Sequence, residues 1–186
     1  MNIKTRIIKK ILLICVIIIP GCSGSCVKTH SAYPLLIDFE ADADLDRLHW
    51  ECRTLFSLSD NHATHGKKSL YVEFYPSDLP QFAPVLETTD WSAFTAVCFD
   101  VYNPAEEEFF IAVRIDDRND FPDYYNSYHQ RITLKPGLNH IRIPFNTFFT
   151  VGMHRPLDIH TIYRFALYKF HPQRKYAFYI DYVRLT

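Results

Sequence analysis

Residues 94–104 read Phe-Thr-Ala-Val-Cys-Phe-Asp-Val-Tyr-Asn-Pro, and this stretch decides the fold. Val97, Phe99 and Val101 occupy every second position, so an extended chain places them on one face and the residues between them on the other. Asn103-Pro104 then breaks the run. The stretch therefore predicts a β-strand that buries one face in a core.

The same signal recurs along the chain from Pro34 onward. No segment keeps a helical period of 3.6 residues for three turns, whereas short extended runs bounded by turn residues are frequent. Nine strands are expected, at 35–40, 53–59, 70–74, 94–102, 109–117, 129–134, 138–143, 163–170 and 176–185. Because no crossover helices separate them, the pattern predicts an all-β, antiparallel two-sheet β-sandwich, a jelly roll of about nine strands.

The connections between strands give further expectations. Lys135-Pro136-Gly137 has Pro and Gly at adjacent positions, as a type II turn requires, and predicts a tight hairpin between the strands on either side of it. Trp91-Ser92-Ala93 and residues 157–161 are expected to form single helical turns.

Alternation also predicts which polar side chains leave the core. The strands at 94–102, 109–117 and 129–134 turn Asp100, Arg114, Asp116 and Arg131 outward, and we expect these side chains to share a face. Tyr168 belongs to another outward edge, and the loop 120–129 carries three tyrosines: Tyr124, Tyr125 and Tyr128. A solvated sheet surface with cross-strand ion pairs is the alternative, in particular for Arg114 and Asp116.

The N-terminal residues have the features of an export signal. Four basic residues precede nine apolar ones, Ile11 to Ile19, and Gly21-Cys22 follows. Nine apolar residues are too few for a membrane-spanning helix, which takes about 20. The arrangement resembles a bacterial lipoprotein signal, which implies cleavage before Cys22, lipidation of Cys22 and a stable membrane anchor. The expected parts are a signal at 1–21, a tether at 22–33 and a domain at 34–186. Ser23 follows the expected lipidation site directly. A serine at this position, in place of aspartate, resembles lipoproteins that are sent to an outer membrane.

Charge and cysteine usage narrow the possible partners. Residues 1–21 contain four of the 20 basic residues and none of the 21 acidic ones. Residues 22–186 therefore have 16 basic and 21 acidic side chains. A nucleic-acid partner is therefore not expected. Cys26, Cys52 and Cys98 remain, an odd number; a disulfide between Cys52 and Cys98 is possible, because spacing does not fix connectivity. No pair has metal-ligand spacing.

Taken in order, eight segments resemble the galactose-binding-like jelly-roll modules, the carbohydrate-binding domains attached to bacterial glycoside hydrolases such as agarases and cellulases. The segments lie at 38–40, 66–70, 90–92, 99–104, 114–117, 134–137, 141–144 and 179–185. The likeness covers almost all of residues 35–185. It implies a two-sheet sandwich, often with a structural calcium ion, whose concave face or loop rim holds a sugar chain.

The resemblance also suggests where calcium would bind. Glu40 and Asp181 stand in segments where the family places metal ligands, and backbone carbonyls near Asp42 and Lys68 would complete a shell of six to eight oxygens. A capping or hydrogen-bonding role for each carboxylate is the alternative.

The residue types fit sugar binding better than catalysis. A sugar presents apolar C–H faces and a rim of hydroxyls, so a binder needs aromatic planes flanked by carboxylate, amide and guanidinium groups. The expected ligand-binding residues are Asp100, Arg114, Asp116, Tyr124, Tyr125, Tyr128, Arg131 and Tyr168. Glycosidases need two carboxyl groups about 5–9.5 Å apart, whereas Asp116 and Asp117 point to opposite faces.

The sequence therefore predicts a non-catalytic, membrane-anchored lipoprotein of the bacterial cell envelope that binds a poly- or oligosaccharide. Two alternatives stay open. One is a scaffold or assembly lipoprotein that binds another envelope protein through its aromatic surface. The other is a polysaccharide lyase that uses Tyr128 or His129 together with Arg114.

Overall fold

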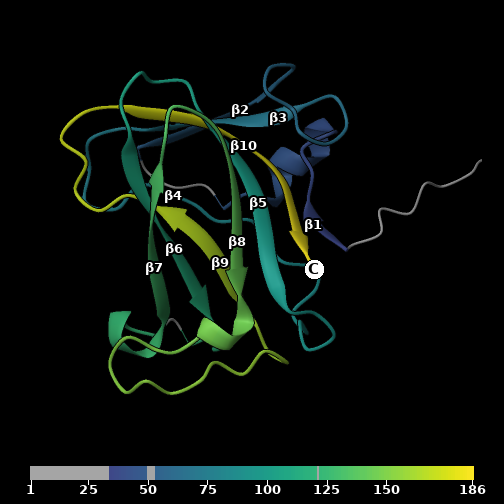
Figure 1. Ribbon diagram of the computed structural model, residues 1–186, viewed down its shortest axis with the longest axis vertical. Coiled ribbons are helices and arrows are strands. Elements are labelled where there is room, and N and C mark those ends of the chain that lie inside the picture. Colours follow the sequence, from purple (N-terminus) through teal and green to yellow (C-terminus); the bar gives the residue numbers. More distant parts are fainter. Residues whose placement is uncertain (1–33, 50–52, 121) are drawn as a thin grey trace, which may run out of the picture.

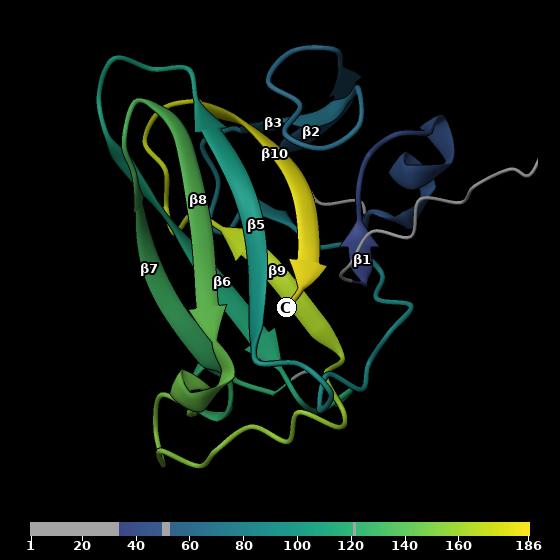
Figure 2. The same ribbon diagram turned by 45° about the vertical axis from the view of Figure 1, so that its right-hand side comes forward.

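The alternation of Val97, Phe99 and Val101 is realised in strand β5 (Ala96–Asn103), where all three side chains are fully buried. The computed structural model describes residues 34–49, 53–120 and 122–186. Within these residues ten strands form two antiparallel sheets stacked in two layers, which confirms the predicted jelly-roll β-sandwich (Figure 1, Figure 2). All nine expected strands are present, and β4 (Gln81–Phe82) is an additional one.

The larger sheet has the strand order β2-β3-β10-β5-β8, with β1 also paired to β10. Its other members are β1 (Leu35–Ile37), β2 (Thr54–Ser59), β3 (Ser69–Phe74), β8 (Gly137–Pro144) and β10 (Tyr176–Leu185). The smaller sheet has the order β4-β9-β6-β7 and contains β6 (Phe109–Asp116), β7 (Tyr128–Leu134) and β9 (Arg164–Tyr168). Three short 3₁₀-helices complete the described elements: η1 (Asp42–Arg47), η2 (Tyr124–Asn126) and η3 (Phe145–Thr147).

The core lies between the inner faces of the two sheets. Ile111, Val113 and Ile115 of β6 are fully buried, as the alternation predicts. Phe99 of β5 meets Phe165 of β9 across the interface, with ring centroids 5.5 Å apart in a T-shaped arrangement. Each fully buried side chain of this size contributes about 1.5–3 kcal/mol. This apolar layer fixes the outer faces of both sheets as the places where polar side chains gather.

Some expected connections differ from the observed ones. Gly137 has the φ of +85° that a type II turn needs, but β7 pairs with β6 and β8 pairs with β5. The turn at 135–137 therefore crosses from one sheet to the other, and the hairpin prediction is wrong. At 91–94 and 158–161 the chain makes single hydrogen-bonded turns, and the 3₁₀-helices form elsewhere.

A β-bulge interrupts β10. Phe178 and Ile180 are fully buried, and so are Val183 and Leu185, so the inward set shifts by one residue between them. The pairing with β5 shifts at the same place, and Tyr182 has a φ of +53°. Such a backbone costs about 1–3 kcal/mol in a residue other than glycine, and the surrounding contacts must offset this cost.

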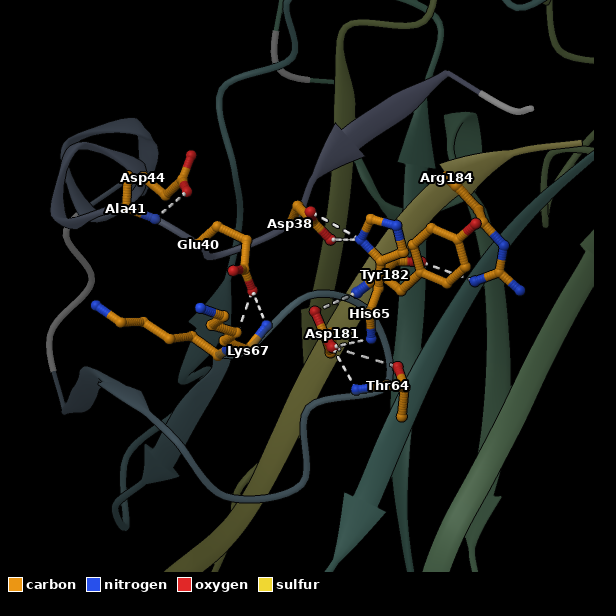
Figure 3. Close-up of polar contacts among 11 residues, drawn as sticks. Asp38, Glu40, Ala41, Asp44, Thr64, His65, Lys67, Asp181, Tyr182 and Arg184 are labelled. Atoms are coloured by element: carbon orange, nitrogen blue, oxygen red, sulfur yellow. Dashed lines mark hydrogen bonds and ion pairs between the residues drawn. The ribbon is translucent and has the colours of Figure 1, made fainter. Parts of the chain in front are cut away.

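The loop 60–68 provides those contacts (Figure 3). One oxygen of Asp181 accepts the backbone N–H groups of Thr64 (2.6 Å) and His65 (2.9 Å), and the other accepts that of Tyr182 (2.7 Å). The His65 ring stacks on Tyr182, with centroids 4.3 Å apart, and its Nδ1 lies 2.9 Å from Asp38. The loop is thus held on the outer side of the six-stranded sheet, directly over the bulge.

Gly66 allows this loop to approach Glu40, in the segment that follows β1. Its φ is +66°, and a Cβ atom there would lie 2.3 Å from the carboxyl carbon of Glu40. Glu40 instead accepts the N–H groups of Lys67 and Lys68, both at 2.8 Å. Only glycine meets both the conformational and the steric requirement.

Cys98 is a buried free thiol, with its Sγ 3.6 Å from the hydroxyl oxygen of Thr186. The disulfide with Cys52 that the sequence allowed is therefore not formed. Cys22, Cys26 and Cys52 lie outside the described residues, as do the expected signal and tether at 1–33. Among the described helices, none has the length and apolar character to cross a membrane.

Asp117, immediately after β6, fastens the long connection before β9. Its carboxylate is buried and accepts two hydrogen bonds from Arg155 (2.5 and 2.9 Å) and one from the N–H of Asp158 (2.8 Å). Burial raises the pKa of Asp117, but these hydrogen bonds and the Arg155 charge outweigh it and hold the pKa below its ordinary value. Asp117 is thus a structural anchor.

Asp117→Asn should therefore lower the free energy of unfolding by about 1.5–3 kcal/mol at pH 7. Because the pKa of Asp117 is lowered in the folded state, its contribution is complete above about pH 4 and is lost as the pH falls through the folded pKa. Urea unfolding of both proteins between pH 2 and pH 7 measures the difference.

Asp120→Asn is the matched control, since Asp120 pairs with Arg118 on an exposed surface. It should cost less than about 1 kcal/mol. Equal losses for the two variants, or a loss for Asp117→Asn that does not shrink on acidification, would contradict the anchoring role.

Candidate ligand-binding groove

The outer face of the four-stranded sheet contains a groove of about 590 Å³. All four strands of this sheet contribute to it, together with the segments next to β4, β7 and β9. Its lining consists of Leu79, Gln81, Phe110, Ala112, Arg114, Tyr124, His129, Arg131, Tyr168 and Phe170. The groove combines aromatic rings with two guanidinium groups, an amide and an imidazole.

Strand register explains why this face is hollow. Gln81, Tyr168, Ala112 and Arg131 stand in one row across β4, β9, β6 and β7. Ala112 has the shortest side chain of the row and lies between two long ones, so its position forms a floor. Successive outward residues of β6 are two residues apart, which places Phe110 and Arg114 on either side of Ala112 along the strand.

Three aromatic rings, those of Tyr168, His129 and Tyr124, make one wall of the groove. Tyr168 is buried, and its hydroxyl oxygen lies 2.8 Å from Nδ1 of His129. The His129 ring packs on Tyr124, with centroids 4.3 Å apart. Tyr124 is 52 % exposed and Phe170 65 % exposed. A ring plane is therefore available to a ligand at the rim, while the residues beneath are fixed.

His129 is a neutral hydrogen-bonding group in this setting. Burial, assisted by the nearby charge of Arg114, lowers the pKa of His129 to about 4. Its Nε2 is buried and has no hydrogen-bond partner within the described part of the chain. Burial also raises the pKa of Tyr168, so its hydroxyl keeps its proton. The pair can donate and accept hydrogen bonds but carries no charge near neutral pH.

Arg114 is held in place by its neighbours. Its Nε donates to both oxygens of Asp116 (2.9 and 3.1 Å), and Nη2 donates to the carbonyl oxygen of Pro122 (2.5 Å). Nη1 of Arg164 lies 3.5 Å from the same carboxylate. Asp116 is only 1 % exposed and is not part of the groove lining. It acts here as the ion-pair partner of Arg114, the alternative that the sequence left open.

Phe110 lies between two cations at the other end of the groove. The guanidinium carbon of Arg131 is 3.5 Å from the ring centroid, and Nζ of Lys169 is 3.9 Å from it. Lys169 is buried and donates to the carbonyl oxygen of Phe110 at 2.8 Å. Burial, together with the charges of Arg131 and Arg174, lowers the pKa of Lys169 to about 8. The ring faces of Phe110 and Tyr176 provide the compensating attraction.

Asp100 does not belong to this face, contrary to the sequence prediction. It lies on β5 in the six-stranded sheet, where its carboxylate is 2.8 Å from Nδ1 of His140. Asp100 and Arg114 are both outward-facing, but they face outward from opposite sheets because the chain crosses between sheets after β5. Outward alternation specifies a face of one strand and not which sheet that strand joins.

Tyr128 and Tyr125 also depart from the prediction. Tyr128 begins β7 and points inward, where its ring packs on Phe148 at 4.8 Å and its hydroxyl donates to Gln130 at 2.6 Å. Tyr125 is 65 % exposed on η2 but is not among the groove residues. Arg114, Tyr124, Arg131 and Tyr168 are thus the predicted ligand-binding residues that the structure brings together.

The groove also contains residues that were not expected in the site. Phe110 could have been found by continuing the outward alternation of its strand by one step, and His129 was expected only in the lyase alternative. Gln81 lies on a two-residue strand that carries no periodic signal. Gln81 also borders a second hollow of about 340 Å³, whose lining includes Arg164 and Tyr163. The concave surface therefore continues along the sheet.

The residues expected to bind calcium have other partners. Glu40 and Asp181 accept N–H groups of the loop 64–68, and the side chains of Lys68 and Asp42 lie 3.9 Å apart as an exposed ion pair. Within the described residues, no group of three or more His, Cys, Asp or Glu side chains is placed to hold a metal ion. A calcium ion would have to replace these hydrogen bonds, and its presence stays a prediction.

No family model matches the sequence, and no curated protein matches it significantly. Solved structures do match. The family 11 carbohydrate-binding module of Clostridium thermocellum in complex with a β-1,3-1,4-mixed-linked tetrasaccharide has 17 % identity and a TM-score of 0.63, over 81 % of this chain and 93 % of the module. The solution structure of CtCBM11 has 19 % identity and a TM-score of 0.64, over 85 % and 96 %.

An exo-β-agarase also matches, with 16 % identity and a TM-score of 0.67. The match covers 82 % of this chain and 25 % of the agarase. At these identities the likeness concerns the fold. The chain has the jelly-roll β-sandwich fold that is also found in carbohydrate-binding modules.

Proposed function

We propose that this protein is a non-catalytic carbohydrate-binding protein that holds a poly- or oligosaccharide in the groove of the four-stranded sheet. The observation that carries the proposal is the groove itself, where exposed aromatic rings stand beside guanidinium, amide and neutral imidazole groups. Aromatic planes pack on the C–H faces of sugars, and the polar groups bind hydroxyls. The volume of about 590 Å³ is in the range of small-ligand sites.

Two further facts support sugar binding. A module of the same fold was solved with a tetrasaccharide. In addition, the concave surface extends past Gln81 into the second hollow, which provides length for a chain of several sugar units. Both observations favour an extended saccharide over a compact small molecule.

The groove is poorly suited to the lyase alternative. His129, Tyr168 and Arg114 do lie together, but a lyase needs a base that accepts a proton near neutral pH. With a pKa of about 4, His129 is a weak base, and the raised pKa of Tyr168 keeps it protonated. Within the part of the chain that the structure describes, the groove lining contains no carboxylate that could replace them.

Tyr124→Ala should weaken saccharide binding about two- to twelvefold, because a lost aromatic contact is worth about 0.5–1.5 kcal/mol. Tyr125→Ala is the matched control, since Tyr125 is its exposed neighbour on η2 and lies outside the groove lining. Titration calorimetry against neutral and acidic polysaccharides measures both, with melting curves to verify folding.

Equal weakening by both variants would place the site elsewhere. If no saccharide binds, the scaffold alternative, with another envelope protein as partner, becomes the better proposal. Ultraviolet absorbance from unsaturated products in the same mixtures would favour the lyase.

We also propose that Cys22 carries lipid and anchors the protein in the bacterial cell envelope, at the outer membrane where there is one. Cys22→Ala should leave the protein without fatty-acid labelling and outside the membrane fraction, whereas Cys26→Ala should remain labelled. The reason is that Gly21-Cys22 follows the apolar run directly, while Cys26 does not. Persistent palmitate labelling of the Cys22→Ala protein would rule the anchor out.

A structural calcium ion at Glu40 and Asp181, with carbonyl oxygens near Asp42 and Lys68, remains our proposal for the loop 60–68. A ligand that binds only the folded state stabilises it, so EDTA should lower the melting temperature and added calcium should restore it. Asp181→Asn should abolish this response. An unchanged melting temperature on chelation, with no metal found by elemental analysis, would support the hydrogen-bonded loop alone.

A further inference from the structure

The charges in the groove are of one sign. Among the described residues, its lining contains Arg114 and Arg131 but no Asp or Glu. Asp116, beneath Arg114, is shared as an ion-pair partner by the guanidinium groups of Arg114 and Arg164. A groove for neutral sugars needs no such excess.

Arg131 contributes a second positive charge. Among the described residues no carboxylate lies within ion-pair distance of its guanidinium group, which instead rests on the ring of Phe110 at 3.5 Å. This contact occupies one face of the guanidinium plane. Its N–H groups lie in the plane and can bind an anionic group in the two-pronged geometry that arginine favours.

Lys169 adds a third positive charge behind the same ring. It donates to the carbonyl oxygen of Phe110, and the described ion pairs include none for its ammonium group. In a partly buried site of lower dielectric, unpaired cations interact with a ligand charge more strongly than in water. An anion at Arg131 would therefore meet attraction from both cations.

The positive charge of the groove contrasts with the net negative charge of the chain after residue 21. The chain after residue 21 has more acidic than basic side chains, 21 against 16, so it does not attract polyanions as a whole. The positive charge of the groove is a local feature of one sheet face. His129 is neutral there and can bind a hydroxyl.

We propose that the groove selects an anionic saccharide, a chain bearing carboxylate or sulfate groups, and binds the anionic group with Arg131 and Arg114. This inference rests on the proposed function and specifies its ligand class. Arg114 is positioned by Asp116 and Pro122, and within the described residues its Nη1 has no hydrogen-bond partner, which leaves that atom for the ligand. The aromatic residues then pack on the sugar rings.

The test compares charged chains with neutral versions of the same chains. Purified protein is titrated with polygalacturonate and its carboxyl-reduced form, with λ-carrageenan and its desulfated form, and with neutral mixed-linkage β-glucan. We expect at least one charged chain to bind tenfold or more tightly than its neutral counterpart. Binding of only one charged chain identifies whether carboxylate or sulfate is the recognised group.

Arg131→Gln should reduce affinity for that charged chain about tenfold and reduce the salt dependence of its binding. Arg142→Gln is the matched control, because Arg142 is exposed on β8 of the opposite sheet and the charge change is the same. It should bind like the wild type. Melting curves verify that both variants fold.

Each contrary outcome has its own meaning. Equal binding of charged and neutral chains, or of the two variants, would overturn the anionic preference while saccharide binding stands. Binding of neutral chains alone would do the same. If no chain binds, the proposed function itself fails, and the inference fails with it.

Discussion

The structure depends on the pairing of β10 with strands on both of its sides. This last strand lies between β3 and β5 in the six-stranded sheet and also pairs with β1. Three strands from distant parts of the chain therefore satisfy backbone hydrogen bonds through residues 176–185. The bulge at Tyr182 realigns the strand so that Phe178, Ile180, Val183 and Leu185 all reach the core. Because these contacts are long-range, a topology of this kind is expected to fold slowly.

Local patterns predicted the strands well because the inner faces of the central strands are mostly apolar. Ile111, Val113 and Ile115 show this directly. Pairing was harder to predict, since it depends on contacts between distant residues. The chain crosses between sheets after β5 and again after β7, so Asp100 and Arg114 face outward on opposite sides of the sandwich. The two-residue alternation within a strand contains no information about which sheet the next strand joins.

Several residues of the candidate site that lie on regular strands were predicted from alternation, and the others were not. Arg114 and Arg131 follow from alternation on β6 and β7, and Tyr168 from the outward edge of β9. Tyr128 was expected in the loop, but the strand begins one residue earlier than expected, and its alternation turns the Tyr128 side chain inward. Gln81 joins the groove through a strand too short to leave a pattern. Ala112 carries no functional group, yet its small size provides the floor.

The polar groups on the two outer faces differ in how completely they are hydrogen-bonded within the protein. This difference explains why the groove has polar atoms available for a ligand. On the six-stranded sheet, the carboxylate of Asp181 accepts hydrogen bonds from backbone N–H groups of the loop that covers it. On the four-stranded sheet, Arg114 and His129 are each held by one set of contacts and still have an atom without a partner among the described residues. Side chains that are already fixed lose little conformational entropy on binding. Buried polar atoms and cations without partners lower the stability of the folded protein. Under the proposed function, a bound saccharide would supply the missing hydrogen-bond partners.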